Sequence, residues 1–392
     1  MRIQRIFAAA LSAVLLSGCL SGGEIADRAV EHNIAVADAA NKLVLLNVVR
    51  ASLRHPVIYT QLTGVSEQIS GGPSASLSIP FGPDAFNAYS ADGAFGVSGY
   101  ASISTAPLED QEFYAGVMTP LSLADIDYYL DAGWPENLIW TLTVEDFEAS
   151  AALYVQVVAA SNAICATSLG AIQCTRLVSG AAPRMTADGA TVFLDNNPRD
   201  EAAFALFQDF LMRLELLGLS VEVVTAANEL RLPSSAQLLA NAEQINNLMA
   251  TGASLRTEGR EIVVTVPYAL SVLRISGIER AGEDRVVGLT AHTRSPDAIL
   301  FYLGEVAGAD APIEVHVGSA ASARFTPLFP VLSCEGGCSN AVVDVDYDGR
   351  NWAIDADNGG RAMQVIAFIH QIFGLHKRAY APPSSNAVTV IN

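Results

Sequence analysis

The sequence predicts an α+β fold with a buried N-terminal helix, mixed helices and largely antiparallel strands. Three observations indicate this class. An apolar helical run that ends at a proline lies within Asn41 to Val65. Segments with helical and strand-like spacing then follow in mixed blocks, whereas a doubly wound sheet requires regular alternation. Near the C-terminus, Asp348-Gly349 separates two alternating segments, which is the strongest short-range signal for a β-hairpin.

The N-terminal helix is predicted from apolar residues at helical spacing that begin near Glu24. From Leu43 onward the run LVLLNVV is apolar on nearly all sides, so this half of the helix should be buried. Pro56 should end the helix at residues 54–55, because the residue before a proline disfavours helical geometry.

Two polar residues, Asn47 and Arg50, lie inside this apolar run. Burying either side chain without a hydrogen-bond partner would cost roughly 1 to 3 kcal/mol or more. We therefore expect both to be structural polar residues with partners elsewhere in the fold. Arg50→Ala should lower thermal stability.

Capping and turn residues define the later elements. Ser122 should cap a helix that ends at Asp131, with Gly133 as the C′ residue. Asn197-Pro198 begins the helix with the clearest signals, and Gly218 ends it.

Further helices are expected at residues 236–249, 296–306 and 361–375. Strands are expected at residues 76–79, 95–100, 138–147, 220–224, 262–266, 270–275, 286–293, 313–317, 341–347 and 351–355, and the tail after residue 380 should return as an edge strand.

The first residues predict export. Two arginines, an apolar run from Ile6 to Leu16 and the segment Leu16-Ser17-Gly18-Cys19 begin the chain. The apolar run is too short to span a membrane, and residues 1–18 have the order of a secretory signal peptide. The segment Leu16-Ser17-Gly18-Cys19 resembles the lipobox of bacterial lipoproteins. The resemblance implies that Cys19 carries a diacylglyceryl thioether and becomes the mature N-terminus.

A lipidated Cys19 would place the protein in the bacterial cell envelope. Several acyl chains on one residue make anchoring stable, so the membrane is the first expected partner. The residue after the cysteine is Leu20 rather than an aspartate. By analogy with lipoprotein sorting in enteric bacteria, this favours the outer membrane, with the protein facing the periplasm. Residues 19–26 are interpreted as a short lipidated tether.

The composition predicts a packed globular protein. The chain is 51% hydrophobic and 16% charged, which excludes disorder. Residues 27–230 are richer in predicted helices and residues 231–392 in predicted strands, either as two parts or as one continuous domain. Loss of the two signal-peptide arginines changes the formal charge from −19 to −19 − 2 = −21. Such an acidic surface repels phosphate backbones, so nucleic acid is not an expected partner.

Four cysteines remain after Cys19, in two close pairs, Cys165 with Cys174 and Cys334 with Cys338. An even number in an exported protein predicts disulfide bonds, and the short spacings favour local pairing, although four cysteines allow three connectivities. A zinc site built from all four thiolates is the alternative. Neither pair has the two-residue spacing of a zinc knuckle.

The uncharged segment of 27 residues between Glu148 and Arg176 is long enough to suggest a membrane helix. Polar residues and a glycine interrupt it, among them Gln156, Ser161, Asn162, Thr167 and Gly170. We therefore expect a buried hairpin or helix that the pair Cys165 and Cys174 closes.

The segment LLNVVRA, followed by Arg54, Pro56, Tyr59 and Leu62-Thr63-Gly64, resembles the N-terminal signature of a group of uncharacterised Gram-negative lipoproteins. The later segments that share this resemblance are residues 132–136, 294–296, 302–305 and 364–375. The resemblance implies a lipoprotein with one shared fold. It implies no catalytic residues, since no activity is known for the group.

The acidic segment near the C-terminus matches the spacing of a calcium-binding EF-hand loop. The matching residues are Asp344, Asp346, Asp348, Gly349 and Asp355. An EF-hand loop lies between helices, whereas the flanking segments here alternate as strands do. Asn351 also stands where the loop needs an aliphatic residue. A plain hairpin without a metal is therefore expected, with weak calcium binding as the alternative.

The sequence contains no catalytic fingerprint. The six histidines are scattered, and none forms an HExxH pair. No nucleophile elbow, P-loop or dinucleotide fingerprint is present. Neighbouring carboxylates such as Glu145 and Asp146 are interpreted as solvated surface, because 41 acidic residues produce such neighbours by chance. No cofactor is expected.

Two hypotheses about function follow. The first is a non-enzymatic envelope lipoprotein with a structural or assembly role, which binds other envelope proteins. The alternative is a cell-wall or glycan-directed binding module or hydrolase, in which paired carboxylates would supply an acid and a base.

Overall fold

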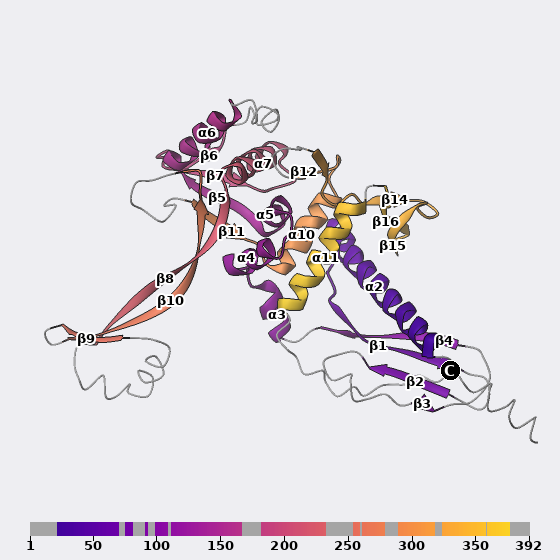
Figure 1. Cartoon of the computed structure of the whole chain (residues 1–392). Coiled ribbons are helices and arrows are strands. Elements are labelled where there is room, and N and C mark those ends of the chain that lie inside the picture. Colours follow the sequence, from indigo (N-terminus) through magenta and orange to yellow (C-terminus); the bar gives the residue numbers. More distant parts are fainter. Residues whose placement is uncertain are drawn as a thin grey trace, which may run out of the picture. The chain divides into compact units, whose positions relative to one another are not determined.

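The computed structural model describes residues 22–69, 75–80, 91–92, 99–108, 111–166, 182–232, 254–258, 261–278, 289–317, 324–357 and 359–376. These residues form helices and antiparallel sheets, which confirms the α+β class (Figure 1). The chain divides into two compact units. Unit 1 contains residues 1–116 and 329–392, and unit 2 contains residues 117–328.

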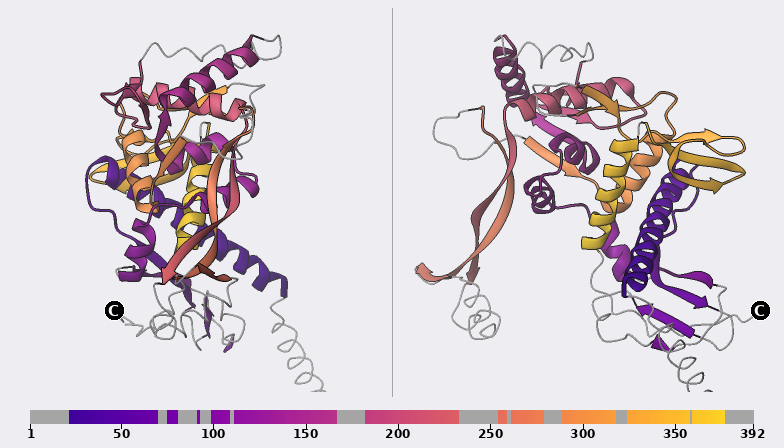
Figure 2. Two further views of the ribbon diagram at one scale, coloured as in Figure 1. Left: turned by 90° about the vertical axis from the view of Figure 1, so that its left-hand side faces the viewer. Right: turned by 45° about the vertical axis from the view of Figure 1, so that its right-hand side comes forward.

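This division differs from the boundary that the sequence suggested near residue 230. Strand β8 (Leu219–Leu232) pairs along its length with β10 (Glu261–Ile275), from Leu219 opposite Ile275 to Leu232 opposite Ile262. Together they form a long antiparallel ribbon in unit 2 (Figure 2). The backbone ladder therefore joins segments on both sides of the predicted boundary.

Unit 1 is organised around α2 (Gly22–Ser52) and α11 (Gly359–His376), which lie side by side in both Figure 1 and Figure 2. The second half of α2 is buried, with Leu45, Val48 and Val49 fully inaccessible, which confirms the sequence prediction. The helix ends at Ser52, close to the predicted end before Pro56. Its first turns include residues 22–26, which were predicted to be a tether.

Two sheets complete unit 1, together with most of α3 (Gln111–Met118), whose last two residues belong to unit 2. One has the order β3-β2-β1-β4, with strands Ala91–Asp92, Ala75–Pro80, Thr60–Ile69 and Gly99–Pro107. The other has the order β14-β16-β15, with strands Leu332–Cys334, Arg350–Asp355 and Ala341–Tyr347. Tyr59 packs between Phe113 and Phe373, with ring centroids 5.2 and 5.3 Å away.

Unit 2 is built on the antiparallel sheet β11-β5-β7-β6. Its strands are Leu289–Thr293, Val144–Ser150, Thr191–Asp195 and Arg184–Met185. The helices are α4 (Leu123–Asp131), α5 (Glu136–Thr143), α6 (Ala151–Cys165), α7 (Glu201–Leu216) and α10 (Pro296–Ala307). Three further strands are β9 (Ser254–Glu258), β12 (Glu314–Val317) and β13 (Arg324–Pro327).

The predicted caps of α4 are confirmed, whereas the predicted N-cap of α7 is wrong. The Ser122 hydroxyl accepts a hydrogen bond from the Asp125 backbone N–H, and the Asp125 carboxylate accepts one from the Ser122 backbone N–H, which completes a capping box. Gly133 follows this helix with a φ of +82°, a left-handed conformation that favours glycine. In α7 the N-cap is Asp200, whereas the sequence suggested Asn197.

Residues 151–165 of the uncharged segment form α6, which confirms a helix there. The helix is buried at Leu153, Val157 and Ser161 and exposed at Val155 and Ile164, so the expectation of a buried helix is wrong for this part. Residues 167–175 lie outside the described part of the chain.

The predicted strand at residues 138–147 is wrong, because the helix α5 occupies its first part. Every residue from Asn137 to Thr143 is buried. A segment that is buried on all sides shows neither the helical nor the strand period, so its pattern could not separate the two. Strand β5 therefore begins only at Val144.

Two predicted strands, residues 262–266 and 270–275, form the single strand β10. Pro267 lies between them, opposite Ala227 of β8. Strand β9 pairs with β10 only as far as Thr265, so Pro267 lies where one edge of β10 has no strand partner among the described residues. A proline is tolerated at such an edge because no ladder hydrogen bond is lost there. The predicted helix at 236–249 and the predicted edge strand after residue 380 lie outside the described residues.

Candidate functional site

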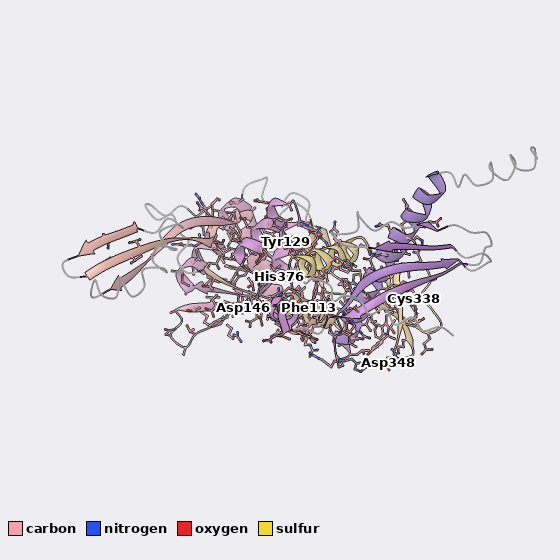
Figure 3. All side chains as sticks on the ribbon, turned by 90° about the horizontal axis from the view of Figure 1, so that it is seen from below. Phe113, Tyr129, Asp146, Cys338, Asp348 and His376 are labelled. Atoms are coloured by element: carbon pink, nitrogen blue, oxygen red, sulfur yellow. A yellow bond between two sulfur atoms is a disulfide. The ribbon has the colours of Figure 1, made fainter. Side chains whose placement is uncertain are left out.

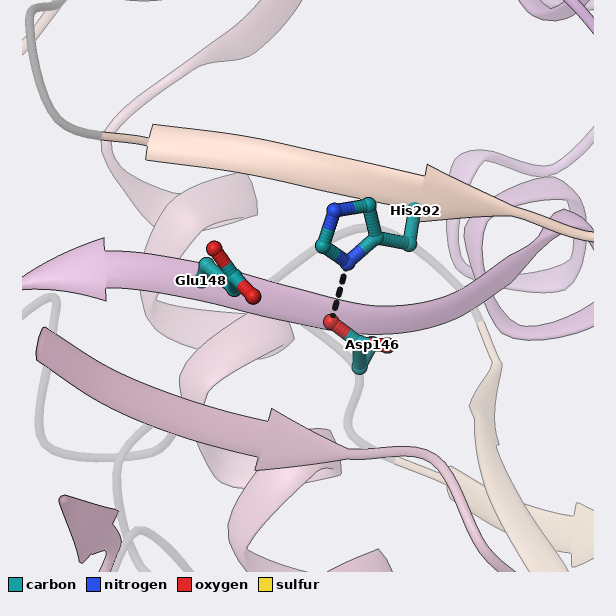
Figure 4. A group of neighbouring side chains, drawn as sticks. All are labelled: Asp146, Glu148 and His292. Atoms are coloured by element: carbon teal, nitrogen blue, oxygen red, sulfur yellow. Dashed lines mark hydrogen bonds and ion pairs between the residues drawn. The ribbon is translucent and has the colours of Figure 1, made fainter. Parts of the chain in front are cut away.

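The candidate site lies on one face of the sheet β11-β5-β7-β6. Asp146 and Glu148 are two residues apart on β5, so their side chains project from the same face. His292 of β11 lies directly opposite Asp146 in the strand register. Figure 4 shows the three side chains together on this face, and we call them the His292 cluster.

The opposite face of the sheet forms part of the core. Phe147, Ala149, Val192 and Leu194 alternate with the polar residues and are buried against the helices. The Phe147 ring stacks on Phe207 of α7, with centroids 5.5 Å apart. Because one face is buried in this way, the strand register that brings Asp146 and His292 together is strongly specified.

The His292 cluster is compact and reaches solvent. His292 Nδ1 lies 2.8 Å from Asp146 Oδ1, and the two side chains are 47% and 22% exposed. One ligand atom from each of Asp146, Glu148 and His292 lies within 4.8 Å of the others. The hydrogen bond with Asp146 raises the pKa of His292, and the negative charges of Asp146, Glu148 and Glu145 add to this effect against the opposing effect of burial.

A second ion pair lies beside this cluster on the same sheet. Asp195 of β7 is opposite Asp146, and its Oδ1 accepts a hydrogen bond of 2.9 Å from Arg184 Nη2. The Arg184 guanidinium also lies 5.3 Å from the centroid of the Phe193 ring. Arg184 thus neutralises the negative charge of Asp195. Asp146 and Glu148, by contrast, carry two negative charges beside the one imidazole of His292.

The arrangement can perform two kinds of chemistry. One imidazole nitrogen and two carboxylates are ligands for a divalent cation, with open positions left for water. Alternatively, Asp146 orients the His292 ring through Nδ1, so that Nε2 can accept or donate a proton. Asp344, Asp346, Asp348 and Asp355 do not form such a group among the described residues.

A buried arginine holds the start of β5 in place. Arg294 donates hydrogen bonds to the carbonyl oxygens of Thr141 and Val144, at the end of α5, and to that of Asn196. The carbonyl end of a helix carries partial negative charge, which favours a cation at this position. Burial lowers the pKa of the Arg294 guanidinium below its ordinary value.

Asn196 completes this network. Its Nδ2 atom donates to the carbonyls of Thr141 and Val144, both at 2.7 Å, and its Oδ1 atom accepts from the Tyr302 hydroxyl at 2.9 Å. Burial raises the pKa of Tyr302, so the hydroxyl remains a donor. The network fixes the point at which α5 ends and β5 begins.

The two predicted structural polar residues interact with each other in unit 1. Asn47 is buried, and its side chain bonds both the N–H and the carbonyl of Ile58, at 3.3 and 3.0 Å. Arg50 is half-buried and donates to Asn47 Oδ1 at 3.2 Å. The Arg50 guanidinium lies 5.5 Å from the centroid of the Tyr347 ring. Asn47 therefore has the expected partner outside its helix, whereas the Arg50 hydrogen bond stays within α2 and its contact outside the helix is with the Tyr347 ring.

The structure describes both members of one of the two predicted cysteine pairs. Cys334 and Cys338 form a disulfide, with Cα atoms 5.4 Å apart. Cys338 is labelled in Figure 3. Cys165 is the last residue of α6, and its predicted partner Cys174 lies outside the described residues, so that pairing stays a prediction. Cys19 also lies outside them.

The acidic segment forms the predicted hairpin rather than an EF-hand loop. Strands β15 and β16 meet at Asp348 and Gly349, whose φ angles of +53° and +74° are those of a type I′ turn. Asp348 is labelled in Figure 3. Asp344 pairs with Lys42, and the Asn351 side-chain amide donates hydrogen bonds to both Asp344 and Asp346. Asp355 accepts a hydrogen bond from Asn340.

Sequence reasoning missed the His292 cluster. Asp146 was assigned to solvated surface, and neither Glu148 nor His292 was singled out. The local signal was the spacing of Asp146 and Glu148, two residues apart on one strand. That signal was hidden because the predicted strand ended at Phe147, and because pairing with the distant β11 has no local sequence signature.

Comparison with protein-family models, with curated proteins and with solved structures finds no match for this chain. Among the described residues, no helix combines the length and the apolar character that crossing a membrane requires.

Proposed function

We propose that the protein is a lipid-anchored component of the bacterial envelope that holds or assembles other envelope proteins. The observation that carries this proposal is the segment Leu16-Ser17-Gly18-Cys19 at the end of an apolar export signal. A lipid on Cys19 would hold the folded units at a membrane surface. The proposal further assigns the protein to the outer membrane, facing the periplasm.

The first half of α2 supports a partner-binding role. This helix begins at Gly22, three residues after Cys19, so a lipid on Cys19 would hold its first turns near the membrane. Val30 and Ile34 lie about one helical turn apart and are 59% and 55% exposed. Exposed apolar side chains on one helical stripe can bind the apolar surface of a neighbouring protein.

Site-specific photocrosslinking in the native host tests this proposal. A photoreactive amino acid replaces Val30 or Ile34 in turn, and a control replaces Asp188, which is exposed in a turn of unit 2. We expect adducts with envelope proteins from the α2 positions and not from position 188. We also expect these adducts to disappear in a Cys19→Ala background, because the unanchored protein leaves the membrane surface. Equal labelling from all three positions, or adducts that persist without Cys19, would contradict the proposal.

A further inference from the structure

We propose that Asp146, Glu148 and His292 bind a divalent transition-metal cation of the zinc class. This inference does not depend on the lipid anchor or on the partner-binding role proposed above. It rests on the ligand types, on their spacing, on the charge of the cluster and on the rigidity of the strands that carry it.

The spacing of the ligand atoms fits one metal ion. A zinc ion binds imidazole nitrogen at about 2.0–2.1 Å and carboxylate oxygen at about 2.0–2.2 Å, so ligand atoms around it lie roughly 3–4 Å apart. In this cluster one ligand atom from each residue lies within 4.8 Å of the other two. His292 Nδ1 and Asp146 Oδ1 are already 2.8 Å apart. A zinc ion would displace the proton that bridges this pair, which is released or moves to Nε2, and an approach of Glu148 would complete a three-ligand set.

The charge of the cluster favours a divalent cation. With a neutral imidazole the two carboxylates carry two negative charges. The nearby arginine, Arg184, is paired with Asp195 on the next strand. Among the described residues, Glu148 has no ion-pair partner. A divalent ion would neutralise both carboxylates, whereas a protonated His292 would neutralise only one.

The strands hold the three side chains in a preorganised geometry. Asp146 and Glu148 flank the fully buried Phe147, and His292 lies on the neighbouring strand in register with Asp146. Ligands on rigid, paired strands need little reordering when a metal binds. Three protein ligands leave at least one coordination position for water or for a ligand from a partner.

The imidazole determines the class of metal. Calcium and magnesium prefer oxygen ligands throughout, so they gain little from His292. Imidazole with carboxylates suits zinc and other first-row divalent ions. The expected order of affinity is therefore zinc well above calcium.

Calorimetric titration of the full-length mature protein with Zn²⁺ tests this inference. The protein is first stripped with a chelator and dialysed, with its disulfides intact. We expect one Zn²⁺ per chain. We expect His292→Ala and Glu148→Gln each to weaken binding by about tenfold or more, because a lost ligand should cost at least as much as a lost outer-shell partner. Circular dichroism confirms that each variant remains folded.

Two matched controls complete the experiment. His370→Ala removes a histidine in unit 1, and Glu201→Gln removes an exposed carboxylate from α7 in unit 2. Both should retain the wild-type Zn²⁺ affinity. The inference is overturned if His292→Ala binds Zn²⁺ as the wild type does, if both controls weaken binding equally, or if Ca²⁺ binds as tightly as Zn²⁺.

Discussion

The Arg294 guanidinium lies 4.0 Å from the centroid of the Tyr302 ring, and both side chains form hydrogen bonds to Asn196. Among the described residues, the hydrogen-bond acceptors of Arg294 are carbonyl oxygens rather than a carboxylate. The charge is therefore stabilised by backbone dipoles at the end of α5 and by the aromatic ring. This contact fixes the start of β5, the strand that carries Asp146 and Glu148.

Arg294→Met should lower the free energy of unfolding by about 2–4 kcal/mol, because buried carbonyl groups lose their donor. Urea denaturation of the whole protein, followed by tryptophan fluorescence, measures this change. Arg184→Met is the matched control, since Arg184 is exposed and forms a surface ion pair. It should change stability by less than about 1 kcal/mol. Equal stabilities of the two variants would show that the Arg294 network does not stabilise the fold.

Asn47→Ala and Arg50→Ala should differ in their effects on thermal stability. Asn47 is buried and bonds both backbone polar groups of Ile58. Its removal leaves those groups without partners and should cost about 1–3 kcal/mol. Arg50 is half-buried, and its removal should cost up to about 1 kcal/mol. Differential scanning calorimetry of both variants would contradict this ranking if Arg50→Ala melts at the lower temperature.

Gly116→Ala should destabilise the protein, although alanine favours helices by up to about 1 kcal/mol over glycine. A Cβ atom at Gly116 in α3 would meet the backbone oxygen of His376 in the same unit. The helices would have to separate, which should cost more than the gain in helix propensity. Gly374→Ala in α11 is the control, because its added Cβ would meet no atom of the described residues within 4 Å apart from its chain neighbours and the backbone of its own helix. Thermal melts should show a lower midpoint for Gly116→Ala and an unchanged or higher midpoint for Gly374→Ala.

Glu215 should make unit 2 less stable as the pH rises. Burial raises the pKa of this carboxyl to about 8, and the nearby Glu136 adds to the effect. The folded pKa lies above the unfolded value of about 4.5, so the folded state binds the proton more tightly. The stability that the protonated Glu215 carboxyl contributes is fully present below the unfolded pKa of about 4.5. It is lost as the pH rises through the folded pKa of about 8.

Glu215→Gln removes this dependence, because glutamine does not ionise. The variant should gain stability relative to the wild type as the pH increases from about 4.5 to about 8. Chemical denaturation at a series of pH values measures the difference. A difference that is constant across this range would show that the pKa of Glu215 is not raised.

Much of the fold could be predicted where local chemistry determines it. Caps and turns are local, so Ser122, Gly133 and the Asp348-Gly349 hairpin were found from their neighbours alone. The buried half of α2 followed from a run with no polar face. The boundary between α5 and β5 was missed, because it depends on Arg294, which lies far along the sequence.

The candidate site was harder to predict than the fold. The His292 cluster requires the pairing of β5 with β11, and the register of distant strands depends on packing of the whole sheet. The acidic segment from Asp344 to Asp355, by contrast, matched the spacing of a calcium-binding loop in the sequence alone. Its carboxylates accept hydrogen bonds from Lys42, Asn351 and Asn340, and Asn351 bridges Asp344 and Asp346. Residue spacing was informative only when the strand arrangement was also known.

Our proposal that the protein is an envelope component depends on the claim that Cys19 carries an anchoring lipid. Mass spectrometry of the N-terminal peptide from protein purified out of native membranes tests it most directly. We predict a peptide that begins at Cys19 and carries the mass of a diacylglyceryl group with further acylation, and a Cys19→Ala variant without this modification. An unmodified Cys19, or a chain that retains residues 1–18, would contradict the claim.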